Sequence, residues 1–594
     1  MNMNRSYLSP LRILRPFETL KPFFKANRWV LLIGVMSLLV VDLLQLFIPL
    51  VIKKAVDLLT TGIATRGLLL RQGAIIVALA LMIGLFRYIW RYLIFGHSRK
   101  VEEGLRNILY AHLQTLSLSF YHKTKTGDLM ARAINDINAI RMATGMGMVA
   151  LTDGLILGMA AIGFMISINV KLALISLIPA PIVVTLTRIL TRRMSSGFER
   201  VQKQFSELTE RVREAFAGIW VIKAFDREQW QYGRVREEGQ RYLHENLGLA
   251  KTLAFFFPMM AIFTNTGLAI VIWLGGRLTI FGQITTGDFV AFTSYLNLLT
   301  WPMMAMGWVT NLLQRASASM KRINIILEEE PEIKDTPTPI VPKSLKGKIT
   351  ISGLHFRYPG RSSFALKGIS LQINPGETIA IVGRVGCGKS TLLMAMVRML
   401  NIPEGVLFID DMDIHHLSLE ALRKHMGFVP QQTMLFSDTV RNNILIGRTD
   451  ISDDQLHVAL EIAAIADEVN ALEAGVDTIL GERGATLSGG QGQRLAIARA
   501  IVSNPPILIL DDAFSMVDME TEKQILSKLL EVRASKTTIV VSHRTSTLAR
   551  ADRIVVMDNG EIIEVGTHHN LLKNGTLYKK LYEERRLAEE LKMM

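Results

Sequence analysis

The fold of the second half of the chain is decided by a stretch that reads TIAIVGRVGCGKST, from Thr378 to Thr391. Thr378–Val382 reads as a buried strand, a glycine-rich loop follows, and the helical run Leu392–Leu400 comes next. This order of strand, G-x-x-x-x-G-K-S loop and helix predicts a phosphate-binding loop. Its glycines let backbone N–H groups close around phosphates, and the helix N-terminus adds its positive dipole end.

The chemistry of the loop predicts ATP and Mg²⁺ as cofactors. Lys389 can reach the outer phosphates, and Ser390 offers a hydroxyl to Mg²⁺. The predicted ATP-binding residues in this loop are Gly383, Arg384, Val385, Gly386, Cys387, Gly388, Lys389, Ser390 and Thr391. Cys387 is interpreted as a small packing residue rather than a redox sensor.

Other short strands surround this loop in the sequence. β-rich runs at Ile349–Ile351, Ile507–Leu510 and Thr538–Val541 alternate with helical segments, which predicts an α/β domain with a mostly parallel sheet. Ile507–Leu510 ends in Asp511, the position of a carboxylate that holds Mg²⁺. We place this domain at residues 349–580, a charged C-terminal helix at 581–594, and a proline-containing linker at 328–348.

The composition of the 594-residue chain indicates a membrane protein. Its mean hydropathy is +0.28 and 49% of its residues are hydrophobic. The net charge of +14 could indicate a nucleic-acid partner, but the basic residues flank apolar runs, which favours a lipid bilayer and no nucleic acid. The single cysteine, Cys387, excludes a disulfide within the chain.

The first half of the chain predicts an all-α transmembrane domain at residues 29–327. About 20 apolar residues cross a bilayer, and six segments qualify: Trp29–Ile52, Gly73–Phe95, Met146–Ile168, Ala173–Ile189, Leu253–Leu274 and Phe289–Leu313. Two long basic stretches separate the second span from the third and the fourth from the fifth. The positive-inside rule places these stretches, and therefore both chain ends, in the cytosol. Residues 1–28 predict an amphipathic elbow helix on the inner membrane surface, with a disordered tail as the alternative.

The sequence Leu487-Ser488-Gly489-Gly490-Gln491 resembles the signature of ATP-binding-cassette transporters without departure. The chain resembles bacterial half-size exporters of that superfamily along nearly its whole length. The remaining family motifs stand in order: Tyr358 for stacking on adenine, Gln431 in its loop, Ser515 and Asp518 in the D-loop, and His543 as the switch histidine.

The resemblance implies that two cassettes close head to tail on two ATP molecules, so the partner is a second half-transporter. The residues Leu487, Ser488, Gly489, Gly490 and Gln491 then act on ATP held by the partner's P-loop. Asp512, His543 and Gln431 are the implied catalytic residues, and Ser390, Gln431 and Asp511 are the implied Mg²⁺ ligands.

Asp512 departs from the family, which usually has Glu after the Mg²⁺-binding Asp. Aspartate is one methylene shorter, and displacement of a catalytic group by about an ångström can cost about a hundredfold in rate. We therefore expect a site that binds ATP and hydrolyses it poorly, in one subunit of a heterodimeric exporter. The alternatives are a homodimer in which Asp512 catalyses adequately and an ATP-gated membrane regulator that moves no solute. An importer is disfavoured by the direct fusion of the two domains.

The resemblance also implies a location and coupling residues. It predicts a multi-pass protein of a bacterial cytoplasmic (inner) membrane that exports hydrophobic drugs or lipids. Asp128 and Phe225 lie in stretches that resemble the two intracellular loops, and we expect them to couple transport to ATPase activity. Charged residues within the spans, among them Asp42, Arg87 and Asp153, are expected to pair with one another or to face a cavity.

Overall fold

The computed structural model describes residues 15–481, 487–542 and 544–593, and for a few residues within its helices it describes the backbone alone. The chain forms two compact units. The first comprises Met1–Gln114 and Thr126–Glu329, and the second comprises Thr115–Lys125 and Glu330–Met594. The short segment 115–125 therefore groups with the C-terminal unit although its sequence neighbours on both sides belong to the other.

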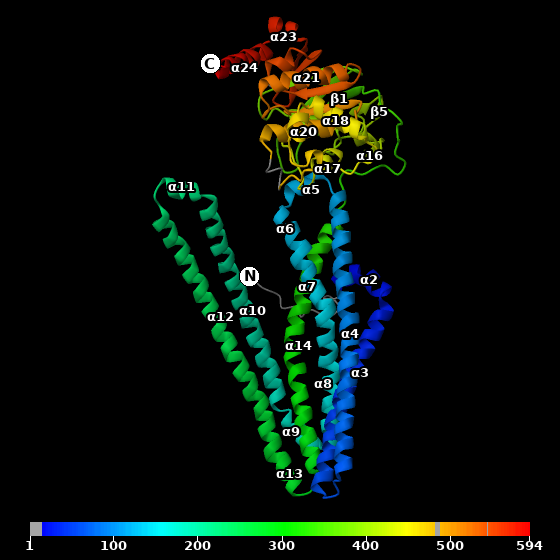
Figure 1. Ribbon diagram of the computed structural model, residues 1–594, viewed down its shortest axis with the longest axis vertical. Helices are drawn as coiled ribbons and strands as arrows, with labels where there is room; N and C mark the ends of the chain where they lie inside the picture. The colour runs from blue at the N-terminus through cyan, green and yellow to red at the C-terminus, as the bar shows by residue number, and fades with distance from the viewer. Residues whose placement is uncertain (1–14, 482–486, 543, 594) are drawn as a thin grey trace. The chain divides into compact units, whose positions relative to one another are not determined.

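The first unit is all-helical (Figure 1). Its elements are η1 (Arg15–Leu20), α2 (Lys21–Ala26), α3 (Arg28–Thr60), α4 (Arg66–Thr115), α6 (Thr126–Ala131), η2 (Arg132–Asp136), α7 (Ile137–Met142), η3 (Ala143–Gly147), α8 (Met148–Ile168), α9 (Val170–Ser176), α10 (Pro179–Ala217), α11 (Ile219–Ala224), α12 (Glu228–Ile270), η4 (Val271–Gly275), α13 (Gly276–Ile280) and α14 (Thr286–Leu327).

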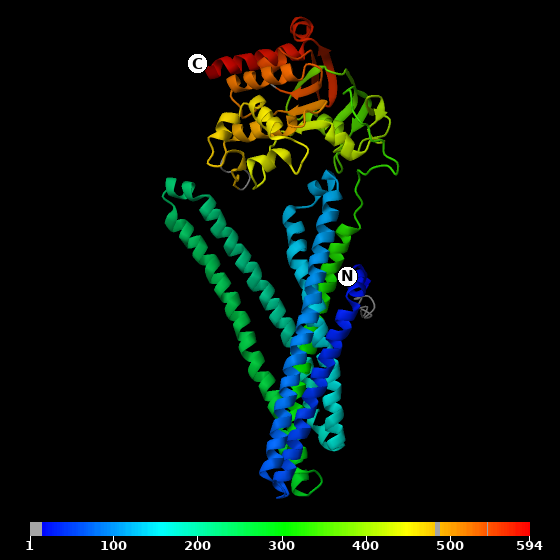
Figure 2. The ribbon, with the colours of Figure 1, turned by 45° about the vertical axis from the view of Figure 1, so that its right-hand side comes forward.

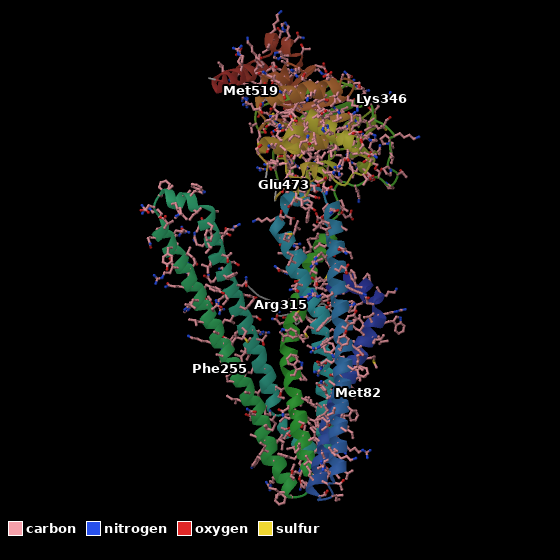
Figure 3. All side chains as sticks on the ribbon, viewed as in Figure 1. Met82, Phe255, Arg315, Lys346, Glu473 and Met519 are labelled. Atoms are coloured by element: carbon pink, nitrogen blue, oxygen red, sulfur yellow. The ribbon has the colours of Figure 1, made fainter. Side chains whose placement is uncertain are left out.

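The helices of this unit pack along their lengths. α14 packs on α3 and α8, and α10 packs along α12 in a hairpin whose tip is α11 (Figures 1 and 2). Large apolar side chains point outward from the long helices, as Met82 and Phe255 show in Figure 3. Outward apolar side chains over the length of a helix suit a lipid environment, where no polar face is needed.

Three helical stretches in the described part of the chain are long and apolar enough to cross a membrane: Arg28–Thr60, Arg66–Thr115 and Thr126–Ile168. They contain the first three predicted spans. The expected count of six is not confirmed, because the other three predicted spans include residues whose side chains are not described. The fourth predicted span is also broken between α9 and α10, where Pro179 takes the first helical position, which proline favours because it needs no N–H donor.

The second unit combines short helices with two sheets. Its strands are β1 (Ile349–Phe356), β2 (Leu366–Ile373), β3 (Thr378–Gly383), β4 (Leu407–Ile409), β5 (Met412–Asp413), β6 (Met426–Val429), β7 (Ile507–Asp511), β8 (Thr537–Val541), β9 (Arg553–Asp558) and β10 (Glu561–Gly566). Its helices are α5 (Leu118–Lys123), α15 (Lys389–Met396), α16 (Leu419–Lys424), α17 (Val440–Leu445), α18 (Asp453–Ile462), α19 (Ala466–Asn470), η5 (Gly475–Asp477), α20 (Gly489–Ile501), α21 (Met519–Val532), α22 (Thr545–Leu548), α23 (His568–Asn574) and α24 (Leu577–Met593).

The larger sheet confirms the predicted α/β class. Its strand order is β10-β9-β3-β8-β7-β6, and every neighbouring pair except β10 and β9 is parallel. The smaller sheet, β2-β1-β4-β5, is antiparallel. Strands β3 and β7 each lead into a loop that carries predicted site residues, so the carboxyl edge of the parallel sheet is where a ligand is expected.

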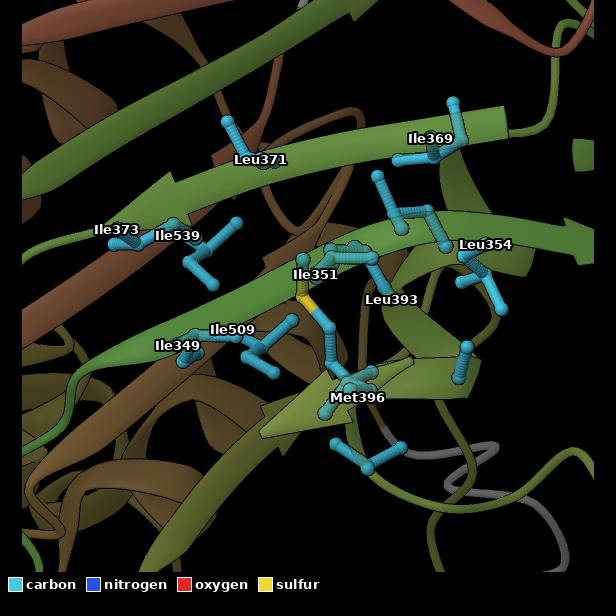
Figure 4. Packing of buried hydrophobic residues seen from close by; sticks show 14 of the residues in the cluster. Ile349, Ile351, Leu354, Ile369, Leu371, Ile373, Leu393, Met396, Ile509 and Ile539 are labelled. Atoms are coloured by element: carbon cyan, nitrogen blue, oxygen red, sulfur yellow. The ribbon is translucent and has the colours of Figure 1, made fainter. Parts of the chain in front are cut away.

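The parallel sheet is buried on both faces. Ile507 and Ile509 of β7 belong to a core shared with β1, β2 and α15, part of which Figure 4 shows, whereas Leu508 and Leu510 belong to a second core with α18, α20 and α21. Successive side chains of a strand point to opposite faces, so a continuous apolar run is what a sheet covered on both sides requires.

Candidate functional site

The phosphate-binding loop leaves β3 at Gly383 and enters α15 at Lys389. The Lys389 side chain is buried and folds back over the loop, where Nζ donates to the carbonyl oxygens of Gly383 (2.8 Å) and Arg384 (2.9 Å). Its Nζ also lies 3.8 Å from Cys387 Sγ. The ammonium group is thus held within the loop, at the N-terminus of α15. The predicted helical run Leu392–Leu400 differs from the structure at both ends, because α15 begins at Lys389 and the left-handed residue Arg398 (φ 51°) follows its end.

Two loop glycines are required by space as well as by backbone conformation. A Cβ on Gly388, whose φ is 101°, would lie 2.6 Å from the carbonyl oxygen of Ala365. A Cβ on Gly383 would lie 2.1 Å from the carbonyl oxygen of Met557 and 2.7 Å from Cys387 Sγ. Because these neighbours include backbone atoms that cannot move aside, the loop keeps its shape only with glycine at both positions. Buried Cys387 is a packing partner of Gly383, in agreement with the packing interpretation of that residue.

A cavity of about 360 Å³ brings most of the predicted site residues together. It is lined by Tyr358, Ala365, Val385, Gly386, Gly388, Lys389, Ser390, Thr391, Gln431, Asp511, Asp512 and Val541. Most of these residues lie at the ends of β7 and β8, in the loops after β3, β6 and β7, or at the start of α15, as expected for a site at the carboxyl edge of a parallel sheet, whereas Tyr358 and Ala365 come from the loop between β1 and β2 of the antiparallel sheet. The cavity offers an aromatic ring at one part of its wall and an ammonium, a hydroxyl and carboxylates at another, which suits a nucleoside triphosphate.

Tyr358 is fixed to the loop that it accompanies. Its hydroxyl lies 3.1 Å from Thr391 Oγ1, and its ring meets Phe356 edge-on with 5.0 Å between centroids. The ring is therefore held in place beside the cavity, where a base can stack on it.

Oxygen donors suited to Mg²⁺ line the same cavity: the Ser390 hydroxyl, the Gln431 side chain and the carboxylate of Asp511. Asp511 ends β7 and is buried, and this burial raises the pKa of its carboxyl, while Ser390 and Lys389 oppose the rise. Hydroxyl and carboxylate oxygens are the donors that Mg²⁺ prefers, so the residues present fit the ion.

Asp512 follows directly and adopts a left-handed backbone (φ 50°), which aspartate tolerates better than most residues. Burial raises the pKa of its carboxyl, and the charge of Asp511 raises it further, against opposing effects of Lys389, Arg544 and Arg585. Its N–H donates to Val541 O (3.1 Å), which fixes the backbone to β8. Asp512 is therefore a half-buried acid in the cavity wall beside a second carboxylate.

The signature residues do not line this cavity. Ser488 caps α20: its hydroxyl accepts from the N–H of Gln491 (3.2 Å), and the Gln491 side chain accepts from the N–H of Ser488 (2.9 Å). This reciprocal capping box could have been predicted from the spacing of Ser488 and Gln491. Ser488 and Gly489, at the N-terminus of α20, are exposed, whereas Gly490 is half-buried.

Two residues that the sequence did not single out hold the D-loop in place: Gln493 from the signature helix α20, and Arg544 from the residue before α22. Gln493, 1% exposed, donates to Ser515 Oγ (2.7 Å) and accepts from the N–H of Met516 (2.8 Å). Arg544 donates to the carbonyl oxygens of Phe514 (2.7 Å) and Val517 (2.5 Å). No local sequence pattern predicts these contacts, because each joins segments more than 20 residues apart.

Asp518 has a structural role in addition to its predicted D-loop role. Its side chain accepts from the N–H of Thr521 (2.9 Å) and caps α21, and hydrogen bonds from Thr521 hold the pKa of its carboxyl below its usual range. Predicted residue His543 lies outside the described residues.

The predicted coupling segments occupy both units. α5 belongs to the cassette unit: Ser117 Oγ, just before it, accepts from the N–H of Ile333 (3.1 Å), and a cavity of about 620 Å³ lies between α5 and the Arg357–Pro359 loop. Asp128 lies in the other unit, in the first turn of α6, where it accepts from Arg132 (2.7 Å). Phe225 ends α11 and is 71% exposed.

Comparison with known proteins agrees with this geometry. Residues 31–303 match the family model described as "ABC transporter transmembrane region", and residues 366–515 match that described as "ABC transporter". The chain is 36% identical to the probable multidrug resistance ABC transporter ATP-binding/permease protein YheI of Bacillus subtilis, over 96% of this chain and 97% of that protein. It is 33% identical to the ATP-dependent lipid A-core flippase of Desulfotalea psychrophila, over 86% of this chain and 88% of that protein. A solved structure of a bacterial Atm1-family ABC exporter with ATP bound covers 94% of this chain at 28% identity, with 98% of that chain covered and a TM-score of 0.78.

Proposed function

This chain belongs to the ABC transporter family and has both its transmembrane region and its ATP-binding domain, and we propose that it is the slow-hydrolysing half of a heterodimeric exporter. The family membership establishes an exporter of the multidrug or lipid type that hydrolyses ATP with Mg²⁺ and works as a dimer in a membrane. The proposal concerns the inequality of the two halves: this chain holds ATP in its own cavity and supplies Ser488 to the partner's ATP.

Asp512 carries the proposal. It stands at the wall of the cavity beside Asp511, at the position where the family usually has Glu, but its side chain is one methylene shorter. A carboxylate about an ångström short of the attacking water can slow hydrolysis about a hundredfold. Binding does not depend on this group, since Lys389, Ser390, Asp511 and Tyr358 all line the same cavity.

The signature helix supports a dimer of unlike halves. The signature is intact, Ser488 and Gly489 are exposed, and none of its residues lines the cavity in which we place this chain's own ATP. An intact signature with an altered hydrolytic residue is the combination that suits a chain whose partner has the competent site. We extend the proposal to a location in a bacterial inner membrane with both termini in the cytosol, and to coupling roles for Asp128 and Phe225.

The test is ATPase activity of the full chain, purified alone and compared with Asp512→Glu and Asp512→Asn variants. We expect slow turnover by the wild-type chain, an increase of at least about tenfold for Asp512→Glu, and little further loss for Asp512→Asn. ATP binding, followed with a fluorescent ATP analogue, should be equal in all three proteins because none of the phosphate-binding groups changes.

A homodimer predicts the opposite pattern. Robust turnover by the wild-type chain that Asp512→Asn abolishes would show that Asp512 is catalytically adequate and would overturn the unequal-halves proposal. ATP-driven uptake of a neutral lipophilic dye into inverted vesicles that contain the complete transporter tests export itself. Regulation without transport would give ATP binding and no uptake.

A further inference from the structure

We propose that Asp42, Arg87 and Asp153 form a binding site for the cationic group of an amphipathic substrate within the helices that span the membrane. Here these three residues are called the polar layer. The proposal rests on the proposed export function, because it names the chemical class of a substrate for that transporter.

Each residue of the polar layer comes from a different one of the three described helices that are long and apolar enough to cross a membrane. Asp42 lies in α3, Arg87 in α4, and Asp153 in the stretch that ends with α8. All three lie within the predicted membrane spans, roughly 10 Å or more from the nearer span end at about 1.5 Å per residue. Charged groups within a membrane span are costly to insert, so those that are kept there usually have a function.

Helical spacing places the polar layer between two packed apolar layers. Asp42 stands one turn from both Leu38 and Leu46, on the same face of α3, and Asp153 stands one turn from both Val149 and Leu157. Leu38 and Val149 belong to one buried cluster, whereas Leu46 and Leu157 belong to another. The two carboxylates are therefore brought to one level of the bundle, with apolar packing on either side along the helices.

Arg87 lies in α4, beside the first apolar cluster. It stands one turn from Ile83 and three residues from Trp90, both members of that cluster. Its charge acts on both Asp42 and Asp153, and the charge of Asp153 acts on Asp42. With both carboxylates ionised, two negative charges face one positive charge.

The groups of the polar layer are not satisfied by one another. Asp42 is 3% exposed and its Oδ2 has no hydrogen-bond partner, and the buried Oδ1 of Asp153 also has none. Among the described residues, Arg87 makes no ion pair within 4.0 Å of either carboxylate. Trp90, 7% exposed, has an unpartnered indole N–H at the border of the layer. Buried polar atoms without partners are rare in folded proteins, so the two carboxylate oxygens are open to the charge of a bound cation.

The expected ligand is therefore a lipophilic cation. An ammonium or phosphonium group would neutralise the excess negative charge, and the Trp90 ring and the flanking leucines would contact its apolar substituents. Asp153 and Arg87 are half-buried, so the layer is reachable from the side of the bundle on which they lie, whereas Asp42 forms its closed end.

The test uses the full chain in lipid nanodiscs and two probes of similar shape, the tetraphenylphosphonium cation and neutral triphenylphosphine oxide. Equilibrium dialysis measures binding of each without ATP. We expect Asp42→Asn and Asp153→Asn to weaken binding of the cation by about 30-fold, the effect of removing one partner from a buried charge pair, and to leave the neutral probe unchanged. Arg87→Gln should strengthen cation binding, because it removes the one opposing charge.

The matched control is Asp57→Asn, on the same helix but outside the layer, where the carboxylate accepts from the N–H of Gly287. It should leave cation binding unchanged. Cation binding that survives both layer variants, or equal weakening of both probes, would overturn the proposal; the first result would also be expected if the layer bound only a proton. ATP-driven uptake of a neutral dye would separate the export proposal from the cation-site proposal. If the dye is taken up but the layer variants bind the cation normally, the export proposal stands and the cation-site proposal is wrong.

Discussion

The P-loop and the signature motif each place glycines at the N-terminus of a helix, but the two helix ends differ. Gly388 precedes α15 without any side-chain cap, so the first N–H groups of that helix remain open to a phosphate. Ser488 and Gln491 close the end of α20 with a capping box. The first residues of α15 line a cavity that also contains an ammonium group, carboxylates and an aromatic ring. Ser488 and Gly489, at the start of α20, are exposed and do not line that cavity.

On the proposal made above, the uncapped end binds ATP and the capped end completes a site in the partner. A helix end with open donors and a lysine can hold a triphosphate within one chain. A capped end can only add a few donors to a nucleotide held elsewhere, which is the arrangement expected of two half-sites in a dimer.

The largest effect is expected at the P-loop. Lys389→Ala removes the ammonium that Gly383 and Arg384 hold over the loop, and we expect ATP affinity to fall at least about a hundredfold, as for the loss of a buried charge partner. Titration with a fluorescent ATP analogue measures the loss. The matched control in the same loop is Arg384→Ala: the sequence predicted this residue to bind ATP, but its exposed side chain does not line the cavity, and its backbone carbonyl is retained in the variant. Equal losses in both variants would mean that the loop, and not the lysine, determines affinity.

An intermediate effect is expected at the signature helix. A Cβ on Gly490 would lie 2.7 Å from the backbone oxygen of Met516, so Gly490→Ala must displace the D-loop, and we expect ATPase activity of the complete dimer to fall about a hundredfold. ATP binding by this chain's own P-loop should not change. Gly492→Ala is the control, because its Cβ would meet its nearest neighbour, Leu435, at an ordinary 3.8 Å.

The contrary result for that pair is loss of ATP binding in Gly490→Ala. It would show that the signature helix supports this chain's own cavity, and the distinction between a binding end and a completing end would fail. Normal ATPase activity in Gly490→Ala would mean that the D-loop can shift without cost to the partner's site.

Both helix ends could be placed from the sequence, but their surroundings could not. The glycine loop and the signature are local patterns, and predicted strands Thr378–Val382 and Ile507–Leu510 correspond to β3 and β7 with one residue added to each. Gln493 and Arg544 were missed because their partners in the D-loop come from distant segments, and the position of a buried side chain is set by packing. The polar layer was foreseen as a set of charges, whereas its level between two apolar clusters required the three helices to be placed.

The smallest effect concerns the carboxylates of the P-loop cavity and depends on pH. Burial and the neighbouring Asp511 raise the pKa of Asp512 above the value of about 3.9 expected in the unfolded chain. The folded protein therefore binds this proton more tightly than the unfolded chain does. Its contribution to stability is fully present below the unfolded pKa and is lost as the pH rises through the folded pKa. At neutral pH, without Mg²⁺ or ATP, the ionised Asp512 should destabilise the cassette.

Asp512→Asn should consequently raise the midpoint of thermal unfolding slightly at pH 7, and the gain should disappear as the pH falls towards 4, where wild-type Asp512 becomes neutral. Differential scanning fluorimetry of the full chain at the two pH values measures this difference between the proteins. Asp518→Asn is the matched control and should lose stability at pH 7, since hydrogen bonds from Thr521 hold the pKa of Asp518 low and favour its ionised form. A gain for Asp512→Asn that is the same at both pH values would show that the carboxylate is not strained by Asp511. Asp512 would then differ from the glutamate usual in the family only in its length, and charge repulsion from Asp511 would not distinguish the P-loop cavity from the signature helix.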